Sequence, residues 1–237
     1  MKLEQALKLA KPYVGTLGKK AGSRPVLKTA LVTEKHVIAT NSHILIRIAH
    51  DEPSVEPYLH HFKKYDETES FEASHYPKTD RLFPDRDYTK SSGPMDTQEM
   101  YEAMQNACIA AKMNAEFELE QLKIKNSRVP KHLKLTVEQL KRDAEGAKSA
   151  RVYLTEDKAE VFDTRHVSET RSFTYNFDEP IPIPEETVFN PEYLKKAIVS
   201  FRSSKEKTIE CNFYGPLRPL YLLAGDIEVI VLPVRAY

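Results

Sequence analysis

The residues best suited to metal chemistry are two adjacent histidines, His60 and His61, which are followed by Asp66 and Glu67. Imidazole and carboxylate groups are the usual protein ligands of zinc, but real sites hold them at characteristic spacings. Here the spacing matches no helical histidine pair. The surrounding residues 50–95 contain scattered prolines and no hydrophobic period, which is typical of loops with at most one short strand. We therefore expect no metal site.

Catalysis by acid–base or nucleophilic groups has equally little support. Asp85 and Asp87 lie two residues apart in a predicted turn, and nothing nearby completes an acid–base pair. The chain contains no glycine-rich dinucleotide motif, no phosphate-binding Walker loop and no Gly-x-Ser-x-Gly nucleophile turn. Cys108 and Cys211 are far apart in sequence and indicate incidental or buried thiols of a reducing compartment. The sequence predicts no cofactor and no enzymatic activity.

Lysine and arginine side chains that cluster along predicted helices could instead bind the phosphates of DNA. Phosphate contact by these cations is long-ranged and independent of base sequence. The alternative is that they form ordinary solvated helix faces, as charged runs do in most soluble proteins. The candidate DNA-binding residues are Lys8, Lys11, Lys19, Lys20 and Arg24, then Lys141, Arg142 and Lys148, and finally Lys195, Lys196, Arg202 and Lys205.

The bulk composition limits the class of protein without identifying it. The 237 residues suffice for one large or two ordinary domains. Lys and Arg together number 35, as do Asp and Glu, so the formal net charge is zero and a uniformly basic surface is excluded. No apolar leader segment or stretch of about 18 apolar residues occurs, so we expect a soluble, intracellular protein without a membrane partner.

Hydrophobic periodicity predicts four helices that begin near residues 3, 97, 136 and 191, each followed by strand-like runs. Pro12 marks a kink or the last turn of the first helix. Residues 117–125 are ambiguous, because they could extend the second helix or form a strand. The expected strands are Val26 to Thr33, His36 to Thr40, Ile44 to Ala49, Arg151 to Leu154, Ala159 to Phe162 and Ser172 to Phe177.

The C-terminal stretch predicts a hairpin of two strands, Leu220 to Leu223 and Val229 to Leu232. Between them, Ala224-Gly225-Asp226 supplies the small and conformationally permissive residues of a tight turn. Pro233 cannot donate to a strand ladder, so it ends the second strand or lies at a sheet edge.

Residues 229–235, Val-Ile-Val-Leu-Pro-Val-Arg, resemble the closing strand of bacterial DNA polymerase sliding clamps of the β-subunit family. Residues 189–198 resemble the strand-to-helix junction of that family's last half-domain. The first helix, the basic loop and the strands that follow resemble the opening of a clamp. Phe83-Pro84-Asp85 resembles the turn that precedes the second helix of a clamp domain.

The resemblance implies an α+β chain with the DNA-clamp fold, with helices lining one face and antiparallel sheets outside. We predict two clamp-like domains, residues 1–130 and 131–237, each with two helix-plus-strands halves. Only about 20 residues separate the second and third helices, too few for a full set of strands. The second half of the first domain therefore departs from the family's pattern.

The resemblance also implies a function and its partners. A ring would encircle double-stranded DNA and tether DNA polymerase and other proteins that carry a clamp-binding peptide. That peptide would bind beside the last strand, at Ile230, Leu232, Pro233, Val234 and Arg235, although such residues at a chain end are ordinarily core.

Because the family's rings contain six domains, a two-domain chain implies a homotrimer, with a clamp loader as a further partner. The expected location is the cytoplasm of a bacterial cell or of a phage-infected host. Two alternatives remain open. The chain could be a nucleic-acid-processing enzyme or its accessory subunit, with residues 50–95 as an active-site loop. It could also be a clamp-fold adaptor that closes no ring.

Overall fold

The computed structural model describes residues 1–14, 25–52, 56–62, 71–83, 89–129, 134–136, 138–139, 151–163 and 170–234. The predicted third helix lies outside these residues apart from its first positions. Within them, three units of helix and strands follow one another, and the chain forms two antiparallel sheets.

The first unit begins with helix α1, Leu3–Ala10, which continues as the 3-10 turn η1, Lys11–Tyr13. Pro12 ends the α-helix, as the sequence predicted, because proline lacks the amide proton that the next helical hydrogen bond requires. The remaining elements are η2 (Pro25–Lys28), β1 (Thr29–Val32), β2 (His36–Thr40), β3 (Ile44–Ala49), β4 (Tyr58–His61), η3 (Ala73–His75) and η4 (Asp80–Leu82).

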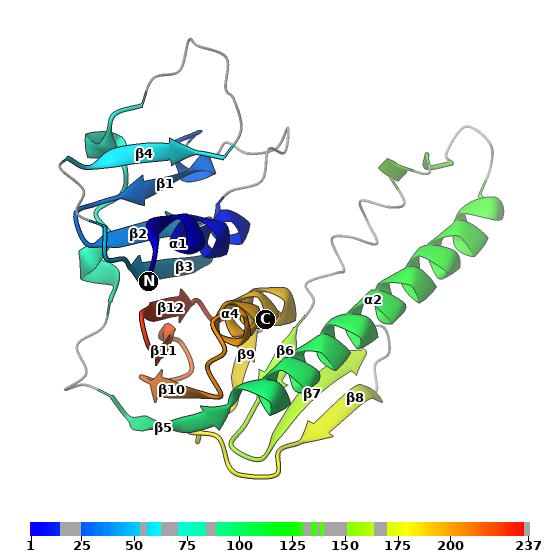
Figure 1. Cartoon of the computed structure of the whole chain (residues 1–237). Coiled ribbons are helices and arrows are strands. Elements are labelled where there is room, and N and C mark those ends of the chain that lie inside the picture. The colour runs from blue at the N-terminus through cyan, green and yellow to red at the C-terminus, as the bar shows by residue number, and fades with distance from the viewer. Residues whose placement is uncertain are drawn as a thin grey trace.

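The second unit is dominated by helix α2, Thr97–Ser127. Asp96 caps its first turn by accepting a 2.8 Å hydrogen bond from the backbone amide of Glu99. At 1.5 Å per residue its length is about 46 Å, and Figure 1 shows it extending beyond the sheet it covers. The strands of this unit are β5 (Ser91–Asp96), which precedes the helix, and β6 (Val152–Leu154), β7 (Lys158–Asp163) and β8 (Thr170–Asn176), which follow it.

The third unit contains helix α4, Pro191–Ser203, which begins at the predicted position. Asn190 accepts a 2.9 Å hydrogen bond from the amide of Glu192, and Pro191 occupies the first turn, where no amide donor is needed. The helix buries the apolar residues Leu194, Ala197, Ile198 and Phe201. Its strands are β9 (Thr187–Phe189), β10 (Thr208–Phe213), β11 (Leu220–Ala224) and β12 (Ile227–Val231).

The larger sheet has eight strands in the order β4-β1-β2-β3-β12-β11-β10-β5, and the smaller has four in the order β8-β7-β6-β9. The first and third units meet where β3 pairs antiparallel with β12, with Ile46 opposite Val229. The predicted α+β class with antiparallel sheets is confirmed. The division into domains at residue 130 remains a prediction, and strands from both sides of that residue share the larger sheet.

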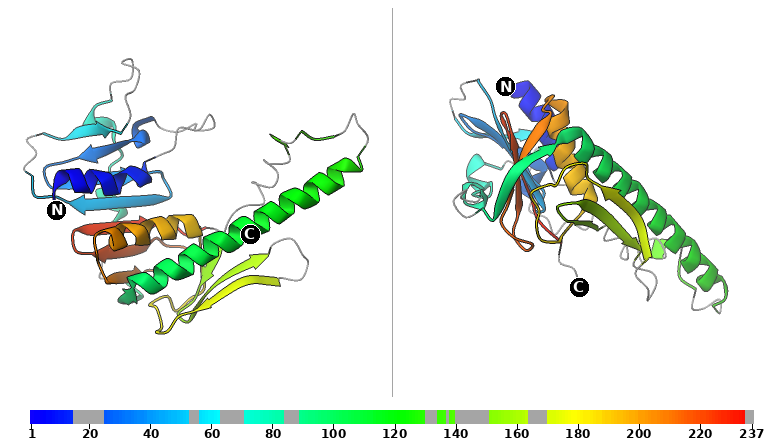
Figure 2. Two further views of the ribbon diagram at one scale, coloured as in Figure 1. Left: turned by 45° about the vertical axis from the view of Figure 1, so that its right-hand side comes forward. Right: turned by 90° about the horizontal axis from the view of Figure 1, so that it is seen from below.

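The three helices α1, α2 and α4 cover one face of the sheets (Figures 1 and 2). The main core lies between these helices and the strands, and its largest fully buried side chains include Tyr13, Phe189, Phe201 and Phe213. Two smaller clusters lie on the opposite face of the eight-stranded sheet, one around Tyr76 and one around Tyr221. Because successive side chains of a strand point to opposite faces, apolar residues of the larger sheet are buried on both of its faces.

Residues 50–95 contain more strand than the sequence predicted. The one short strand allowed for is β4, which carries His60 and His61 and pairs with β1. Strand β5 was not predicted, because Ser-Ser-Gly-Pro is a poor strand sequence. It forms at the edge of the sheet, where Pro94 is tolerated, and is stabilised by pairing with β10.

Candidate nucleic-acid interface

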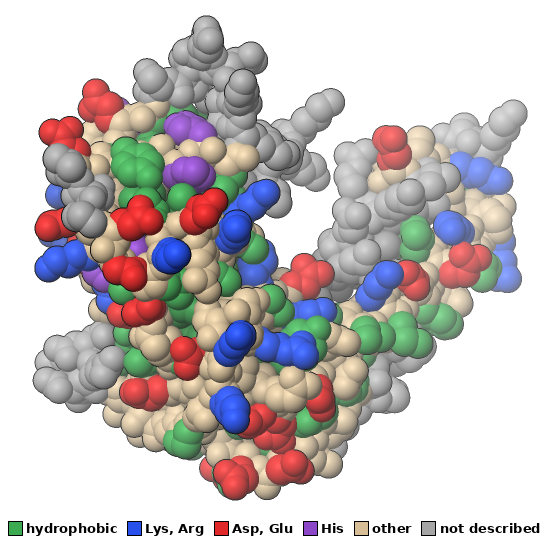
Figure 3. All heavy atoms as spheres, in the orientation of Figure 1, with side chains coloured by type: hydrophobic (Ala, Val, Ile, Leu, Met, Phe, Trp, Pro, Cys, Tyr) green, Lys and Arg blue, Asp and Glu red, His purple; other side chains and the backbone are tan. Residues whose placement is uncertain are grey.

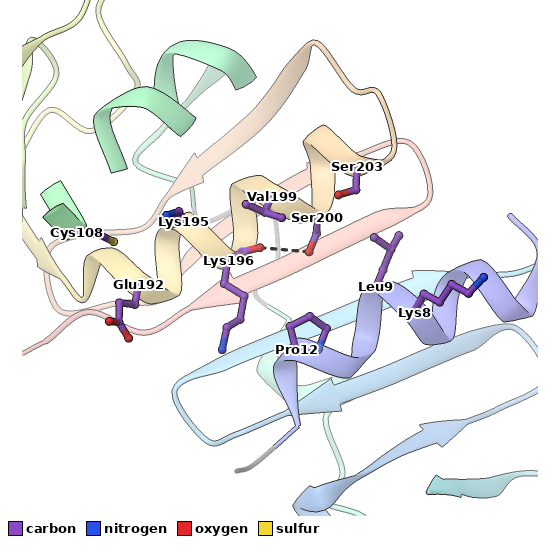
Figure 4. Close-up of a pocket in the computed structure, with 10 residues that line it drawn as sticks. All are labelled: Lys8, Leu9, Pro12, Cys108, Glu192, Lys195, Lys196, Val199, Ser200 and Ser203. Carbon is purple, nitrogen blue, oxygen red and sulfur yellow. Dashed lines mark hydrogen bonds between the residues drawn. The ribbon is translucent and has the colours of Figure 1, made fainter. Parts of the chain in front are cut away.

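A groove of about 420 Å³ runs between α1 and α4 on the helix face. Figure 4 shows Lys8, Leu9 and Pro12 on one side of it and Lys196, Val199 and Ser200 on the other. Its remaining lining residues are Cys108, Glu192, Lys195 and Ser203. Three of the predicted DNA-binding lysines, Lys8, Lys195 and Lys196, are therefore brought together from segments about 190 positions apart.

One buried contact fixes the spacing of the two sides of the groove. The hydroxyl of Tyr13 lies 2.8 Å from Oγ of Ser200, and it also donates a 3.3 Å hydrogen bond to the carbonyl of Lys196. Burial raises the pKa of Tyr13 well above its ordinary value, so the hydroxyl stays protonated at neutral pH. The turn η1, which continues α1, is thus held against α4 at the level of Lys196.

The lysines in the groove have different degrees of exposure. Lys8 is exposed, whereas Lys195 and Lys196 are partly buried along the helix. Burial lowers the pKa of Lys196, and the carboxylate of Glu192 opposes this shift. A lysine that is already partly dehydrated loses less hydration when a phosphate binds.

The other described members of the predicted DNA-binding set do not line the groove. Lys11 is exposed in η1. The guanidinium carbon of Arg202 lies 4.1 Å from the centroid of the Tyr101 ring, which joins α4 to α2. Lys205 follows α4 in a left-handed conformation with a φ of 64°. Lys19, Lys20, Arg24, Lys141, Arg142 and Lys148 lie outside the described residues.

The charge on the helix face suits a sequence-independent contact with a polyanion. Figure 3 shows Lys and Arg side chains over the central part of this face, and Asp and Glu side chains along its left-hand side and toward its lower margin. Such a distribution can attract a phosphate backbone although the chain as a whole is neutral.

A second cavity, of about 250 Å³, lies where β3 and β12 meet on the side of the Tyr221 cluster. Two predicted peptide-binding residues, Ile230 and Leu232, line it. Most of its wall comes from the first unit and was not predicted. The lining residues from that unit are Leu27, Thr40, Ser42, His43, Ile44, Leu45, Pro77, Thr79 and Leu82, and Pro219 is a further one from the third unit.

The other predicted pocket residues are placed differently. The amide of Val234 donates a 2.8 Å hydrogen bond to the carbonyl of Val188, so the tail lies beside β9 of the smaller sheet. Pro233 and Val234 are partly buried but are not among the lining residues. Arg235 lies outside the described residues. The pairing of β3 with β12 is what brings the first unit to this cavity, and a single sequence carries no direct signal of that long-range contact.

The metal site considered above gains no support from the residues that the structure describes. Within the described ranges, no three His, Cys, Asp or Glu side chains gather as they would around a metal ion. His60 and His61 are successive strand residues, and such residues point to opposite faces of a sheet. Asp66, Glu67, Asp85 and Asp87 lie outside the described residues. None of the helices in the described part of the chain is long and apolar enough to cross a membrane.

No family model matches this chain, and no curated protein matches its sequence. Its fold, however, is similar to that of several solved sliding clamps. The DNA polymerase III beta chain of Streptococcus pneumoniae superposes with a TM-score of 0.58 at 15% identity, over 98% of this chain and 62% of that one. The beta subunit of Thermotoga maritima gives 0.61 at 13% identity, over 99% and 64%.

A third structure is the Helicobacter pylori beta clamp bound to a DNA ligase peptide, with a TM-score of 0.55 at 11% identity over 98% of this chain and 63% of that one. The chain thus spans somewhat less than two thirds of the length of these clamps. At such identities the likeness establishes the fold alone. The protein has the fold of the DNA polymerase III beta-subunit sliding clamps.

Proposed function

We propose that this protein is a DNA sliding clamp, a non-enzymatic processivity factor that encircles duplex DNA and tethers replication proteins. The observation that carries the proposal is the convergence of Lys8, Lys195 and Lys196 on one groove of the helix face in a chain with a clamp fold. Contacts of this type bind the DNA backbone without reading its sequence, as sliding requires.

Partner proteins would bind in the cavity at the junction of β3 and β12. It is concave, lined mainly by apolar side chains, and accessible on the face opposite the helices, so a partner there would not obstruct DNA in the groove. We infer that it accepts a short hydrophobic peptide from DNA polymerase and from other clamp-binding proteins. Leu232, which is partly exposed at its rim, would contact that peptide.

Ring closure would use the free edges of the sheets. The eight-stranded sheet ends at β4 and β5, and the four-stranded sheet ends at β8 and β9. An exposed edge presents unpaired backbone groups that a second copy can satisfy, and a closed ring removes such edges altogether. A homotrimer in the cytoplasm of a bacterium or a phage-infected host, opened by a clamp loader, remains our proposal for the assembly.

DNA binding by the groove is tested by charge reversal. Lys8→Glu and Lys195→Glu should weaken binding to a short duplex of any sequence, and each should reduce the slope of log affinity against log salt by about one. Lys78→Glu is the matched control, because Lys78 is an exposed lysine between η3 and η4, beside residues that line the cavity at the β3–β12 junction. Equal losses in all three variants would overturn the assignment of the groove.

Peptide binding is tested at the rim of the cavity. Leu232→Ser should abolish binding of a labelled hexapeptide Gly-Ser-Leu-Ser-Leu-Phe, measured by fluorescence anisotropy. Leu217→Ser removes the same apolar group from a position that is 79% exposed and is not a lining residue, so it should bind the peptide normally. A peptide that binds Leu232→Ser as tightly as the unaltered protein would place its site elsewhere.

A further inference from the structure

Three side chains connect the cavity at the β3–β12 junction with the groove on the helix face. The rings of His43 and Tyr193 are stacked, with centroids 5.5 Å apart and planes inclined by 13°. Nζ of Lys196 lies 5.7 Å from the centroid of the same tyrosine ring. His43 lines the cavity and Lys196 lines the groove, so Tyr193 contacts one lining residue of each site.

The backbones at both ends of this stack are fixed. The amide of His43 donates to Oδ1 of Asn41 at 3.0 Å, and its carbonyl accepts a 3.0 Å hydrogen bond from the amide of Leu232. The carbonyl of Lys196 accepts hydrogen bonds from the hydroxyls of Tyr13 and Ser200, each at 3.3 Å. Because the main chain is held at both sites, changes in one site reach the other through the side chains.

We propose that Tyr193 is a positioning residue that couples the two sites, so that a ligand in the cavity strengthens DNA binding in the groove. The inference rests on the proposed function, because it requires both sites to bind their ligands. The His43 ring limits where the Tyr193 ring can lie, and that ring in turn is the surface against which the Lys196 ammonium packs.

The direction of the coupling follows from side-chain entropy. A free lysine side chain samples many rotamers, and a phosphate that binds it must order it. A ligand that packs against His43 restricts the His43–Tyr193 stack and thereby keeps Lys196 in the groove before DNA arrives. DNA binding then has to order fewer rotamers of the Lys196 side chain, so the DNA binds more tightly. By linkage, the peptide binds more tightly when DNA is present.

The test measures the Kd of a short DNA duplex with and without saturating hexapeptide Gly-Ser-Leu-Ser-Leu-Phe. In the unaltered protein the peptide should lower that Kd about two- to fivefold, the equivalent of an exposed cation–π contact. Tyr193→Phe keeps the ring and should keep the effect, whereas Tyr193→Leu should abolish it. Phe117→Leu removes an exposed ring from α2, outside the groove and the cavity, and serves as the control, with the effect intact.

The outcomes separate this inference from the proposed function. If peptide and DNA both bind but the Kd for DNA does not change, the coupling is overturned while the clamp proposal stands. If either ligand fails to bind the unaltered protein, the clamp proposal itself fails. The role of the Tyr193 ring would be overturned if the coupling survived in Tyr193→Leu or if it were lost in Tyr193→Phe. The phenylalanine variant provides this test even if the leucine variant does not fold.

Discussion

The hydroxyl of Tyr13 lies 2.8 Å from Oγ of Ser200, and this buried contact joins the first and third units of the chain across the helix face. Tyr13→Phe removes the hydroxyl and leaves a buried polar atom with one partner fewer. We expect the free energy of unfolding to fall by about 1–2 kcal/mol, measured by urea denaturation. Combining it with Ser200→Ala should cost less than the sum of the two single changes, and strict additivity would contradict a direct interaction.

Two methionines on α2 provide a matched test of which face of the helix is buried. Met104 is fully buried, whereas Met113, about two and a half turns later and so on the opposite face, is 63% exposed. Met104→Ser should destabilise the fold by about 2–5 kcal/mol, because it removes buried apolar volume and introduces a hydroxyl into the core. Met113→Ser should change stability by less than about 0.5 kcal/mol. Thermal melts of both variants provide the measurement, and a large loss in Met113→Ser would mean that its side chain is covered.

Ser42 is a strained residue at the rim of the cavity, since its φ of 76° lies in the left-handed region that side chains disfavour. Ser42→Gly should leave stability unchanged or raise it by up to about 1 kcal/mol, and Ser42→Val should lower it by more than that. Chemical denaturation of the two variants gives the comparison. A valine variant as stable as the glycine variant would contradict the left-handed conformation.

Cys108 should be a slow nucleophile although it lines the groove. Burial raises its pKa to about 11, and the neighbouring Lys195 only partly opposes this effect. Since the thiolate is the reactive form, alkylation by iodoacetamide should be slow at pH 8 and accelerate about tenfold per pH unit up to pH 10. Cys211 is fully buried and should react only after unfolding. Rapid alkylation of Cys108 at neutral pH, followed by peptide mass spectrometry, would contradict the raised pKa.

The sequence predicted those helices and strands whose bounds depend on neighbouring residues alone. The C-terminal hairpin, the start of α4, and strands β2 and β3 form at or within a residue or two of the expected bounds, because turn chemistry and apolar periodicity act over a few residues. The ambiguous residues 117–125 belong to α2. Their apolar residues do not keep a single buried stripe, and Ile124 is 41% exposed, so periodicity could not distinguish helix from strand.

The features that sequence reasoning missed depend on contacts between distant segments. Strand β5 exists because β10 pairs with it, and the cavity wall at Thr40 and Leu45 exists because β3 pairs with β12. Similarly, Lys8 and Lys196 were predicted to bind DNA, but their place on one groove follows from the packing of α1 beside α4. Long-range register of this kind is set by the whole core and leaves no local signature.

The central claim is that the protein encircles DNA, and retention on an end-blocked duplex tests it most directly. The protein is allowed to bind a linear biotinylated duplex, streptavidin is added to block both ends, and high salt is applied. A ring that has threaded over the free ends should remain on the blocked duplex and leave the unblocked one, because salt weakens phosphate contacts but does not open a topological link. Equal release from both duplexes would contradict encirclement and leave a clamp fold that binds DNA only along its surface.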